Sequence, residues 1–153
     1  MTPIIREATQ EDIVQMLPLL EQLFAIEEDF KFDPDTQSRG LGLMLDGCGK
    51  HKTVKLACLG SRVIGMCTAQ TRISTAQGRI CAVVEDLVVD KGHRGKGLGR
   101  QLLAAIEGWA RARGIISLGL LADRDNQQGL AFYKNQAWEG TKLICLVKPC
   151  GPP

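Results

Sequence analysis

The sequence predicts a mixed α/β fold built around one sheet, and three observations carry this prediction. Short apolar runs typical of strands alternate along the chain with segments whose apolar residues recur at helical spacing. The turn signal Gly60-Ser61-Arg62 joins two consecutive strand-like runs, which indicates an antiparallel hairpin. The 153 residues show no internal repeat or linker. We therefore expect a mixed, mostly antiparallel sheet of about six to seven strands, with helices on both faces.

The first half of the chain is predicted to hold three strands and two helices. The strand-like stretches are residues 2–7, 53–59 and 63–73. The first helix starts at residues 9–12 in the manner of a capping box, with Asp12 in place of the usual Glu or Gln, and Pro18 is expected to bend or divide it. Its apolar stripe consists of Leu19, Leu20, Leu23, Phe24 and Phe30. Residues 34–45 are predicted to form the second helix.

The second half is predicted to continue as helix, strand, short helix and a terminal pair of strands. Apolar residues at helical spacing run from Gly97 to about Arg113, and Gly114 ends this helix. Residues 116–122 have the composition of a buried strand. Asn126 is a suitable N-cap for the short helix that follows.

A glycine-rich turn after the strand that ends near Val89 is the first candidate site. Gly95, Gly97 and Gly99 allow a tight turn that aims several N–H groups at one point, where the helix N-terminus adds partial positive charge. A phosphate fits there. The spacing matches neither the dinucleotide fingerprint G-x-G-x-x-G nor the nucleotide loop G-x-x-x-x-G-K-[ST].

Two carboxylates interrupt the apolar strand just before this turn. Glu85 and Asp86 are adjacent, so regular pleating sends them to opposite faces, and only a bulge brings both to one side. A carboxylate on the inner face needs a cleft or a partner. The alternatives are a catalytic carboxylate, a solvated acid on a bulge, or a structural ion pair, for example to Arg124.

The pattern of these residues resembles the GNAT superfamily of acetyl-CoA-dependent N-acetyltransferases. The resemblance rests on Arg94-x-x-Gly97-x-Gly99 after a strand, and on Asn126 followed by Phe132-Tyr133 and Trp138. It covers about residues 83–146. The chain departs from the family at Gly129, where Ala is common, and at Ala137, where Gly is common. Alanine in a left-handed helix cap costs roughly 1 kcal/mol. We therefore expect the short helix not to end in the left-handed conformation that glycine at this position would allow.

The resemblance implies one acetyltransferase domain over residues 1–150, followed by a short tail at 151–153. It implies a sheet that splays between its fourth and fifth strands. It also implies transfer of an acetyl group from acetyl-CoA to a primary amine by direct attack, with Glu85 as the base or water-positioning residue, Asp86 structural and Tyr133 as the acid. The residues implied for acetyl-CoA are Leu87, Val88, Val89, Arg94, Gly95, Lys96, Gly97, Leu98, Gly99, Arg100, Asn126 and Tyr133.

Several of these residues also have a simpler interpretation. Tyr133 could pack beside Phe132, and Lys96 and Arg100 could be solvated surface charges. The acidic run at residues 27–29 could attract a cationic amine or could be a solvated helix end. Small amines, amino sugars, peptide N-termini and lysines therefore all stay open as acceptors. A non-catalytic acyl-CoA-binding regulatory module is the alternative function.

Composition argues against several other classes. A net charge of +2 with dispersed basic residues does not favour nucleic acid, and no apolar run approaches the ~18 residues of a membrane span. We expect a cytoplasmic protein without a metal, and the habit of the family implies a homodimer. His93 is expected to be a solvated loop residue or a minor phosphate contact. The six cysteines, Cys48 among them, are expected mainly to pack as small apolar residues.

Overall fold

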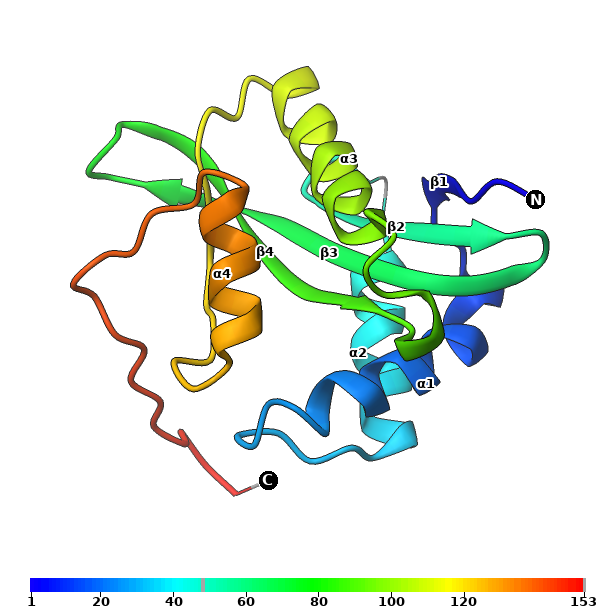
Figure 1. The fold of residues 1–153 in the computed structure, drawn as a ribbon. Helices are drawn as coiled ribbons and strands as arrows, with labels where there is room; N and C mark the ends of the chain where they lie inside the picture. The colour runs from blue at the N-terminus through cyan, green and yellow to red at the C-terminus, as the bar shows by residue number, and fades with distance from the viewer. Residues whose placement is uncertain (48, 153) are drawn as a thin grey trace. The chain divides into compact units, whose positions relative to one another are not determined.

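The computed structural model describes residues 1–47 and 49–152 (Figure 1). The chain divides into two compact units, Met1–Leu120 and Leu121–Pro153, and each is described by itself. Cys48, one of the cysteines expected to pack in the core, lies outside the described residues. Within the described ranges, no helix is long and apolar enough to cross a membrane.

The first unit contains one sheet whose strands lie in chain order. Its strands are β1 (Ile4–Glu7), β2 (Lys52–Leu59), β3 (Arg62–Ser74), β4 (Arg79–Val89) and β5 (Leu118–Leu120). The first three neighbouring pairs are antiparallel and β4 pairs with β5 in parallel, which confirms a mixed, mostly antiparallel sheet. The paired residues of β4 and β5 end at Val84 and Leu120, so β4 continues to Val89 beyond β5. This is the expected splay between the fourth and fifth strands.

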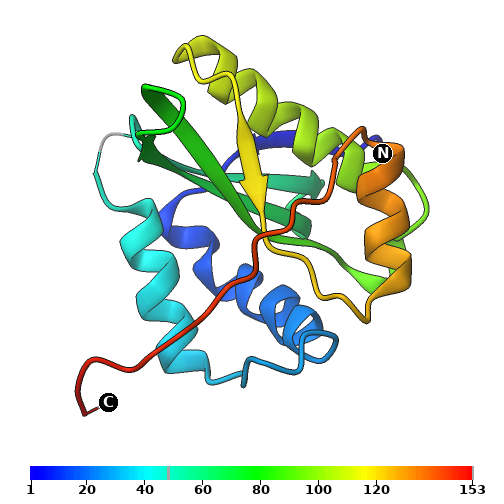
Figure 2. The ribbon, with the colours of Figure 1, turned by 90° about the vertical axis from the view of Figure 1, so that its left-hand side faces the viewer.

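Helices cover both faces of this sheet, as predicted. Figures 1 and 2 show α1 (Ile13–Phe24) and α2 (Pro34–Leu45) on one face and α3 (Leu98–Ala112) on the other. Each helix presents an apolar stripe to the strands, and the buried residues of α3 are Leu98, Leu102, Leu103, Ile106, Trp109 and Ala110. Gly65 on β3 allows this close packing, because a Cβ there would lie 3.2 Å from Leu102 Cδ1 and from the Val88 carbonyl oxygen.

The helical turn Gln10–Asp12, which leads into α1, has the expected capping box, and Pro18 does not divide the helix. Asp12 Oδ2 accepts hydrogen bonds from the Thr9 N–H at 2.8 Å and from the Thr9 hydroxyl at 3.1 Å. The helix then runs without interruption through Pro18 to Phe24. Because proline has no N–H, the helical hydrogen bond from position 18 to the Val14 carbonyl is missing. The Val14 side chain is exposed, so water can reach this turn of the helix. Phe30, expected on the apolar stripe, lies beyond the helix and is exposed.

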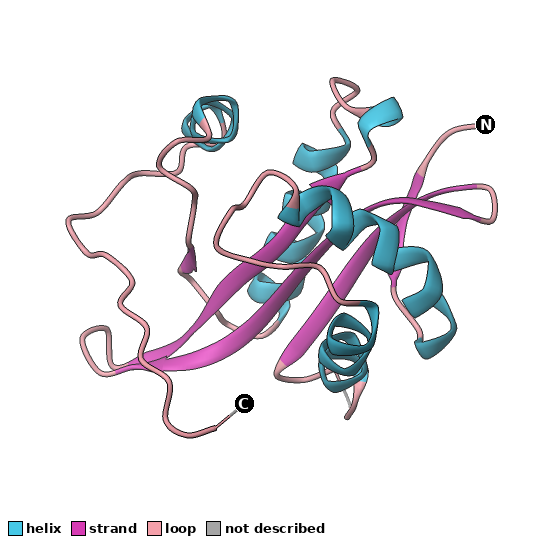
Figure 3. Ribbon diagram, turned by 90° about the horizontal axis from the view of Figure 1, so that it is seen from below, coloured by secondary structure: helices cyan, strands magenta, loops and turns pink. Residues whose placement is uncertain are grey.

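Two strand predictions in the second half are wrong. The segment expected as a buried strand over 116–122 contributes only β5, whose three residues are not buried, and Ile116 and Leu121 beside it are exposed. The described residues after α4 (Gln127–Asn135), through Pro152, contain no strand, so five strands replace the expected six to seven (Figure 3). A strand needs a partner for its N–H and C=O groups, and the described part of the second unit holds no other strand to pair with this tail.

The end of α4 corrects a third expectation. Ala137 has a φ of +64°, so the helix ends in the left-handed conformation in spite of the methyl group. The Trp138 N–H donates to the Tyr133 carbonyl at 3.0 Å and the Ala137 N–H donates to the Lys134 carbonyl at 3.1 Å. These two hydrogen bonds form the Schellman pattern. In this pattern the two residues joined by the longer hydrogen bond, here Tyr133 and Trp138, commonly make a side-chain contact. Their rings lie 6.1 Å apart, which offsets part of the strain.

Replacement of Ala137 by glycine is therefore expected to stabilise the end of α4 by about 1 kcal/mol. Hydrogen exchange of the Trp138 N–H, which closes this end, should slow by roughly 5-fold. Ala131→Gly is the matched control, because Ala131 lies inside α4, where glycine is unfavourable, and it should accelerate exchange. Equal acceleration by both variants would show that position 137 carries no strain.

Candidate active site

The predicted site residues fall in both units. Glu85, the residues at the end of β4, the glycine turn and the start of α3 form one continuous stretch of the first unit. Asn126 and Tyr133 belong to α4 and its N-cap in the second unit.

A β-bulge separates Glu85 from the end of β4. Glu85 lies opposite Thr68 and Val88 lies opposite Met66, so two residues of β4, Asp86 and Leu87, face the single residue Cys67 of β3. Asp86 has a φ of +50°, which few residues other than glycine adopt. The bulge interrupts the regular alternation that would send the two adjacent carboxylates to opposite faces. Glu85 is exposed, whereas Asp86 is half-buried.

Asp86 is held by Thr68, a residue that sequence reasoning missed. The Thr68 hydroxyl, whose residue is only 2% exposed, donates to Asp86 Oδ2 at 3.1 Å. Burial raises the pKa of the Asp86 carboxyl, the Thr68 hydrogen bond opposes this rise, and the nearby charge of Glu85 adds to it. A polar residue within the apolar run of β3 was the only sequence signal for this contact.

The raised pKa of Asp86 predicts a pH-dependent effect of Asp86→Asn on stability. When the pKa of a group is higher in the folded state, its stabilising contribution is complete below the unfolded value and is lost as the pH rises through the folded value. Asparagine avoids the buried charge, can still accept from Thr68 and tolerates a positive φ. The melting temperature of the variant relative to the parent should therefore rise between pH 3.5 and 7.5. A constant or falling difference would contradict this assignment.

Asp90 fixes the point where the loop leaves β4. Its N–H donates to the Ile64 carbonyl at 2.9 Å, and its carboxylate accepts from Gln22 Nε2 at 3.0 Å. His93 Nδ1 lies 2.9 Å from Asp90 Oδ2, so His93 is a partly buried partner of Asp90 rather than the expected solvated residue. Hydrogen bonds, first from Gln22 and then from His93, lower the pKa of the Asp90 carboxyl. The loop thus begins from a fixed anchor.

The glycine turn that follows has the predicted form. Gly95 and Gly97 have φ values of +75° and +77°, and Gly97 is the N-cap of α3. The first intrahelical hydrogen bond of α3 runs from the Gln101 N–H to the Gly97 carbonyl at 3.1 Å. The N–H groups of residues 98–100 therefore have no acceptor within the helix. Apart from the adjoining residues of the chain, no atom lies within 4 Å of a Cβ built at position 95 or 97, so the space beside the turn is open.

Charge around the turn is positive. Arg94, Lys96 and Arg100 are exposed, and no acidic residue occurs between Lys91 and Ile106. Arg94 Nε donates to the Val89 carbonyl at 2.9 Å, which ties this side chain to the end of β4. Open amides, a helix N-terminus and three cations fit a diphosphate group.

The end of β4 offers backbone groups for an extended ligand. Leu87 and Val89 lie beyond the last residue that pairs with β5. Such a strand can pair with an amide-containing chain in the manner of an added strand.

The second unit places Asn126 and Tyr133 on α4. Asn126 Oδ1 accepts from the Gly129 N–H at 3.0 Å, which confirms the predicted cap. A Cβ at Gly129 would lie 2.6 Å from Asn126 Nδ2, so an alanine there would require the Asn126 side chain to shift. The Tyr133 ring contacts those of Phe132 and Trp138, with centroids 5.4 and 6.1 Å away. Ring packing, the simpler interpretation of Tyr133, therefore holds, and the role of its hydroxyl stays a prediction.

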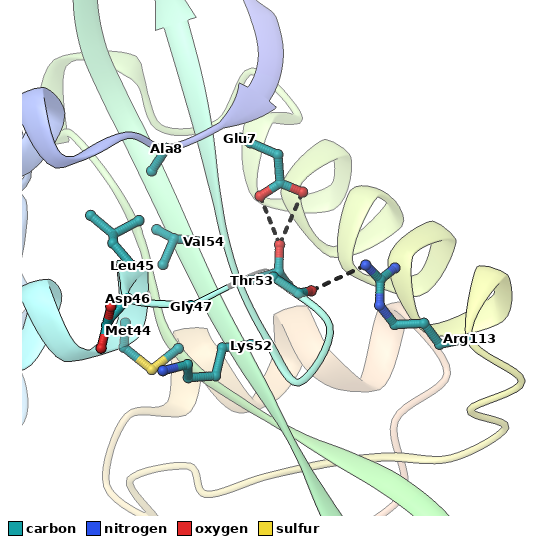
Figure 4. Close-up of a pocket in the computed structure, with 11 residues that line it drawn as sticks. Glu7, Ala8, Met44, Leu45, Asp46, Gly47, Lys52, Thr53, Val54 and Arg113 are labelled. Carbon is teal, nitrogen blue, oxygen red and sulfur yellow. Dashed lines mark hydrogen bonds between the residues drawn. The ribbon is translucent and has the colours of Figure 1, made fainter.

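A pocket of about 310 Å³ lies elsewhere in the first unit, and no predicted site residue lines it (Figure 4). The Thr53 hydroxyl donates to both carboxylate oxygens of Glu7, at 2.9 and 3.1 Å. Lys52 Nζ donates to the Leu43 carbonyl at 2.7 Å, and Arg113 Nη2 donates to the Gly49 carbonyl at 3.1 Å. Because these polar groups already bond to other groups of the protein, we interpret the pocket as a packing gap beside the end of α2 and not as a ligand site.

Comparison with known proteins gives one family. A sequence model of the acetyltransferase (GNAT) family matches residues 18–138, which is most of the chain. A comparison with curated protein sequences finds no significant match.

Solved structures with the same fold include three of particular interest. A transcriptional regulator from Bacillus halodurans C-125 is 24% identical, with 96% of this chain and 99% of that chain covered and a TM-score of 0.84. A ribosomal-protein-alanine N-acetyltransferase from Brucella melitensis biovar Abortus 2308 is 20% identical, with 98% and 100% covered and a TM-score of 0.75. An aminoglycoside N-acetyltransferase in complex with CoA is 18% identical, with 98% and 96% covered and a TM-score of 0.83. These identities support the shared fold alone.

Proposed function

Since the chain belongs to the GNAT acetyltransferase family, we propose that it transfers the acetyl group of acetyl-CoA to a primary amine by direct attack. The observation that carries the proposal is the continuous sequence, from Glu85 to Arg100, of a bulge, a strand end that β5 does not pair, the glycine turn and the helix N-terminus. The complex of a similar fold with CoA supports the choice of coenzyme.

Acetyl-CoA supplies the activated acetyl group, and the first unit supplies most of its proposed contacts. The amides from Arg94 to Gly99 bind the diphosphate, with Lys96 and Arg100 contributing charge. The backbone of residues 87–89 is proposed to pair with the pantetheine arm, for which the family resemblance also implies Asn126. The support for this assignment is the open space beside Gly95 and Gly97 and the end of β5 pairing at Val84.

Two side chains are proposed to move protons. An amine is mostly protonated near pH 7, so a base must take its proton before the lone pair attacks the thioester carbonyl. Glu85 is exposed and can exchange protons with water, whereas Asp86 is held by Thr68, so Glu85 is the proposed base. Tyr133, the only tyrosine of the chain, is proposed to give a proton to the departing thiolate.

Tyr133→Phe is expected to lower kcat by roughly 10- to 1000-fold, because the ring remains while the proton donor is lost. The Kd of CoA, measured by calorimetry, should change little. Phe132→Leu is the control for ring packing, since it removes a neighbour of Tyr133 and keeps the hydroxyl. If Tyr133→Phe turns over at the parent rate, Tyr133 is a packing residue only.

A panel of amines incubated with acetyl-CoA tests the proposed function. Small amines, amino sugars, peptides with free N-termini and peptides with lysine each enter one arm, and release of free thiol reports transfer. Mass spectrometry must then find the amine heavier by one acetyl group. Tight CoA binding without acetylation of any amine would instead support the non-catalytic acyl-CoA-binding module.

A further inference from the structure

A glutamine of α1 joins that helix to the start of the coenzyme loop. Gln22 Nε2 donates to Asp90 Oδ1 at 3.0 Å, and Gln22 Oε1 accepts from the Lys91 N–H at 2.9 Å. The NH₂ group and the oxygen of the Gln22 side-chain amide therefore both form hydrogen bonds, and their partners are two consecutive residues of the loop. Figure 1 shows the loop after β4 beside α1.

The two residues that Gln22 holds lie where the loop changes direction. Asp90 follows the last residue of β4 and is tied to β3 through the Ile64 carbonyl. Lys91 begins the single helical turn Lys91–His93, which is closed by the bond from the His93 N–H to the Asp90 carbonyl at 2.8 Å. Arg94 comes next, so the orientation of this turn sets the direction in which the amides of the glycine turn point.

We propose that Gln22 is a positioning residue for acetyl-CoA binding, which it promotes by holding the loop in its binding conformation before the coenzyme arrives. The inference rests on the proposed function, because it assumes that the loop holds the diphosphate. Loss of the clamp removes two of the hydrogen bonds that hold the turn at residues 91–93. The turn then samples more conformations in the free protein, and ordering it opposes binding. Gln22 itself needs no contact with the coenzyme.

The same helix provides a matched control. Gln15 lies seven residues, or about two turns, before Gln22. Its Nε2 donates to the Ser61 carbonyl at 3.1 Å and its Oε1 accepts from the Val63 N–H at 2.9 Å. This clamp also uses both ends of one side-chain amide, but both of its partners are backbone groups of Ser61 and Val63, at the turn between β2 and β3.

The experiment compares Gln22→Met with Gln15→Met, since methionine keeps the length of the side chain and removes both hydrogen bonds. CoA is titrated into each folded protein by calorimetry, and thermal melts measure stability. We expect both variants to lose stability, while the Kd of CoA rises roughly 3- to 10-fold in Gln22→Met and stays within about 2-fold in Gln15→Met. Gln22→Ala should repeat the pattern of Gln22→Met. In turnover, KM for acetyl-CoA should rise while kcat at saturation stays unchanged.

The outcomes separate this inference from the proposed function. A parent protein that does not bind CoA overturns both. Binding by the parent with equal Kd values in all variants overturns the role of Gln22 alone. Equal weakening in the Gln15 and Gln22 variants also overturns it, because the effect would then follow general stability.

Discussion

Glu85→Gln is expected to lower kcat by about 10²-fold or more at a saturating concentration of the true acceptor. Glutamine preserves the shape of the side chain but cannot accept a proton. Glu85 is exposed, so the substitution removes no buried contact and should leave the melting temperature close to that of the parent. The pH profile of kcat provides a second readout, because the acidic limb of the parent's profile should disappear in the variant.

Asp86→Asn is the matched control, because it makes the same chemical change at the adjacent residue. Asp86 accepts from Thr68 on the bulge, and asparagine can keep that bond. We expect this variant to keep most of its kcat and to change stability with pH. A larger kcat defect in Asp86→Asn than in Glu85→Gln, with normal folding, would reverse the roles of the two carboxylates.

Gly97→Glu is expected to remove the rise in melting temperature that acetyl-CoA gives the parent protein. Gly97 has a φ of +77°, and apart from the adjoining residues of the chain no atom lies within 4 Å of a Cβ built there, so the new side chain occupies the open space assigned to the diphosphate. Its negative charge also repels phosphate. The backbone strain itself costs roughly 1 to 2 kcal/mol, so the variant should melt at a lower temperature without ligand.

Gly78→Glu separates strain from loss of the site. Gly78 has a φ of +63° and equally open surroundings, and it lies in the turn between β3 and β4. This variant should lose similar stability and keep the full shift with acetyl-CoA. An undiminished shift in Gly97→Glu would place the coenzyme elsewhere.

Local patterns predicted those parts of the fold that depend on neighbouring residues. The helix predicted over residues 34–45 has those bounds in the structure, because Asp33 caps it and Pro34 suits its first turn. The hairpin at Gly60-Ser61-Arg62, the start of α3 after Gly97 and the Asn126 cap were likewise predicted from short segments. Each of these features is decided within a few residues of the chain.

Features that depend on distant partners were missed or wrong. The bond from Thr68 to Asp86 crosses two strands, and the bonds from Gln22 to the loop join residues 68 and 69 positions apart, which no local periodicity reveals. The tail after α4 has an apolar run, yet it forms no strand in the described residues because a strand requires a partner. At Ala137 the closing hydrogen bonds of the helix end, together with the ring contact between Tyr133 and Trp138, outweigh an unfavourable φ. The roles of Glu85, Tyr133 and the coenzyme contacts stay predictions.

The most direct test of the proposed coenzyme site is a titration of the ¹⁵N-labelled protein with acetyl-CoA, followed through the backbone amide resonances. The largest shift changes are expected at Gly95, Gly97 and Gly99, with smaller changes along residues 87–89. The amides of Gly49 and Thr53, which line the separate pocket, should stay unchanged. Changes concentrated at that pocket, with the amides of residues 94–99 unaffected, would contradict the claim that the glycine turn holds the coenzyme.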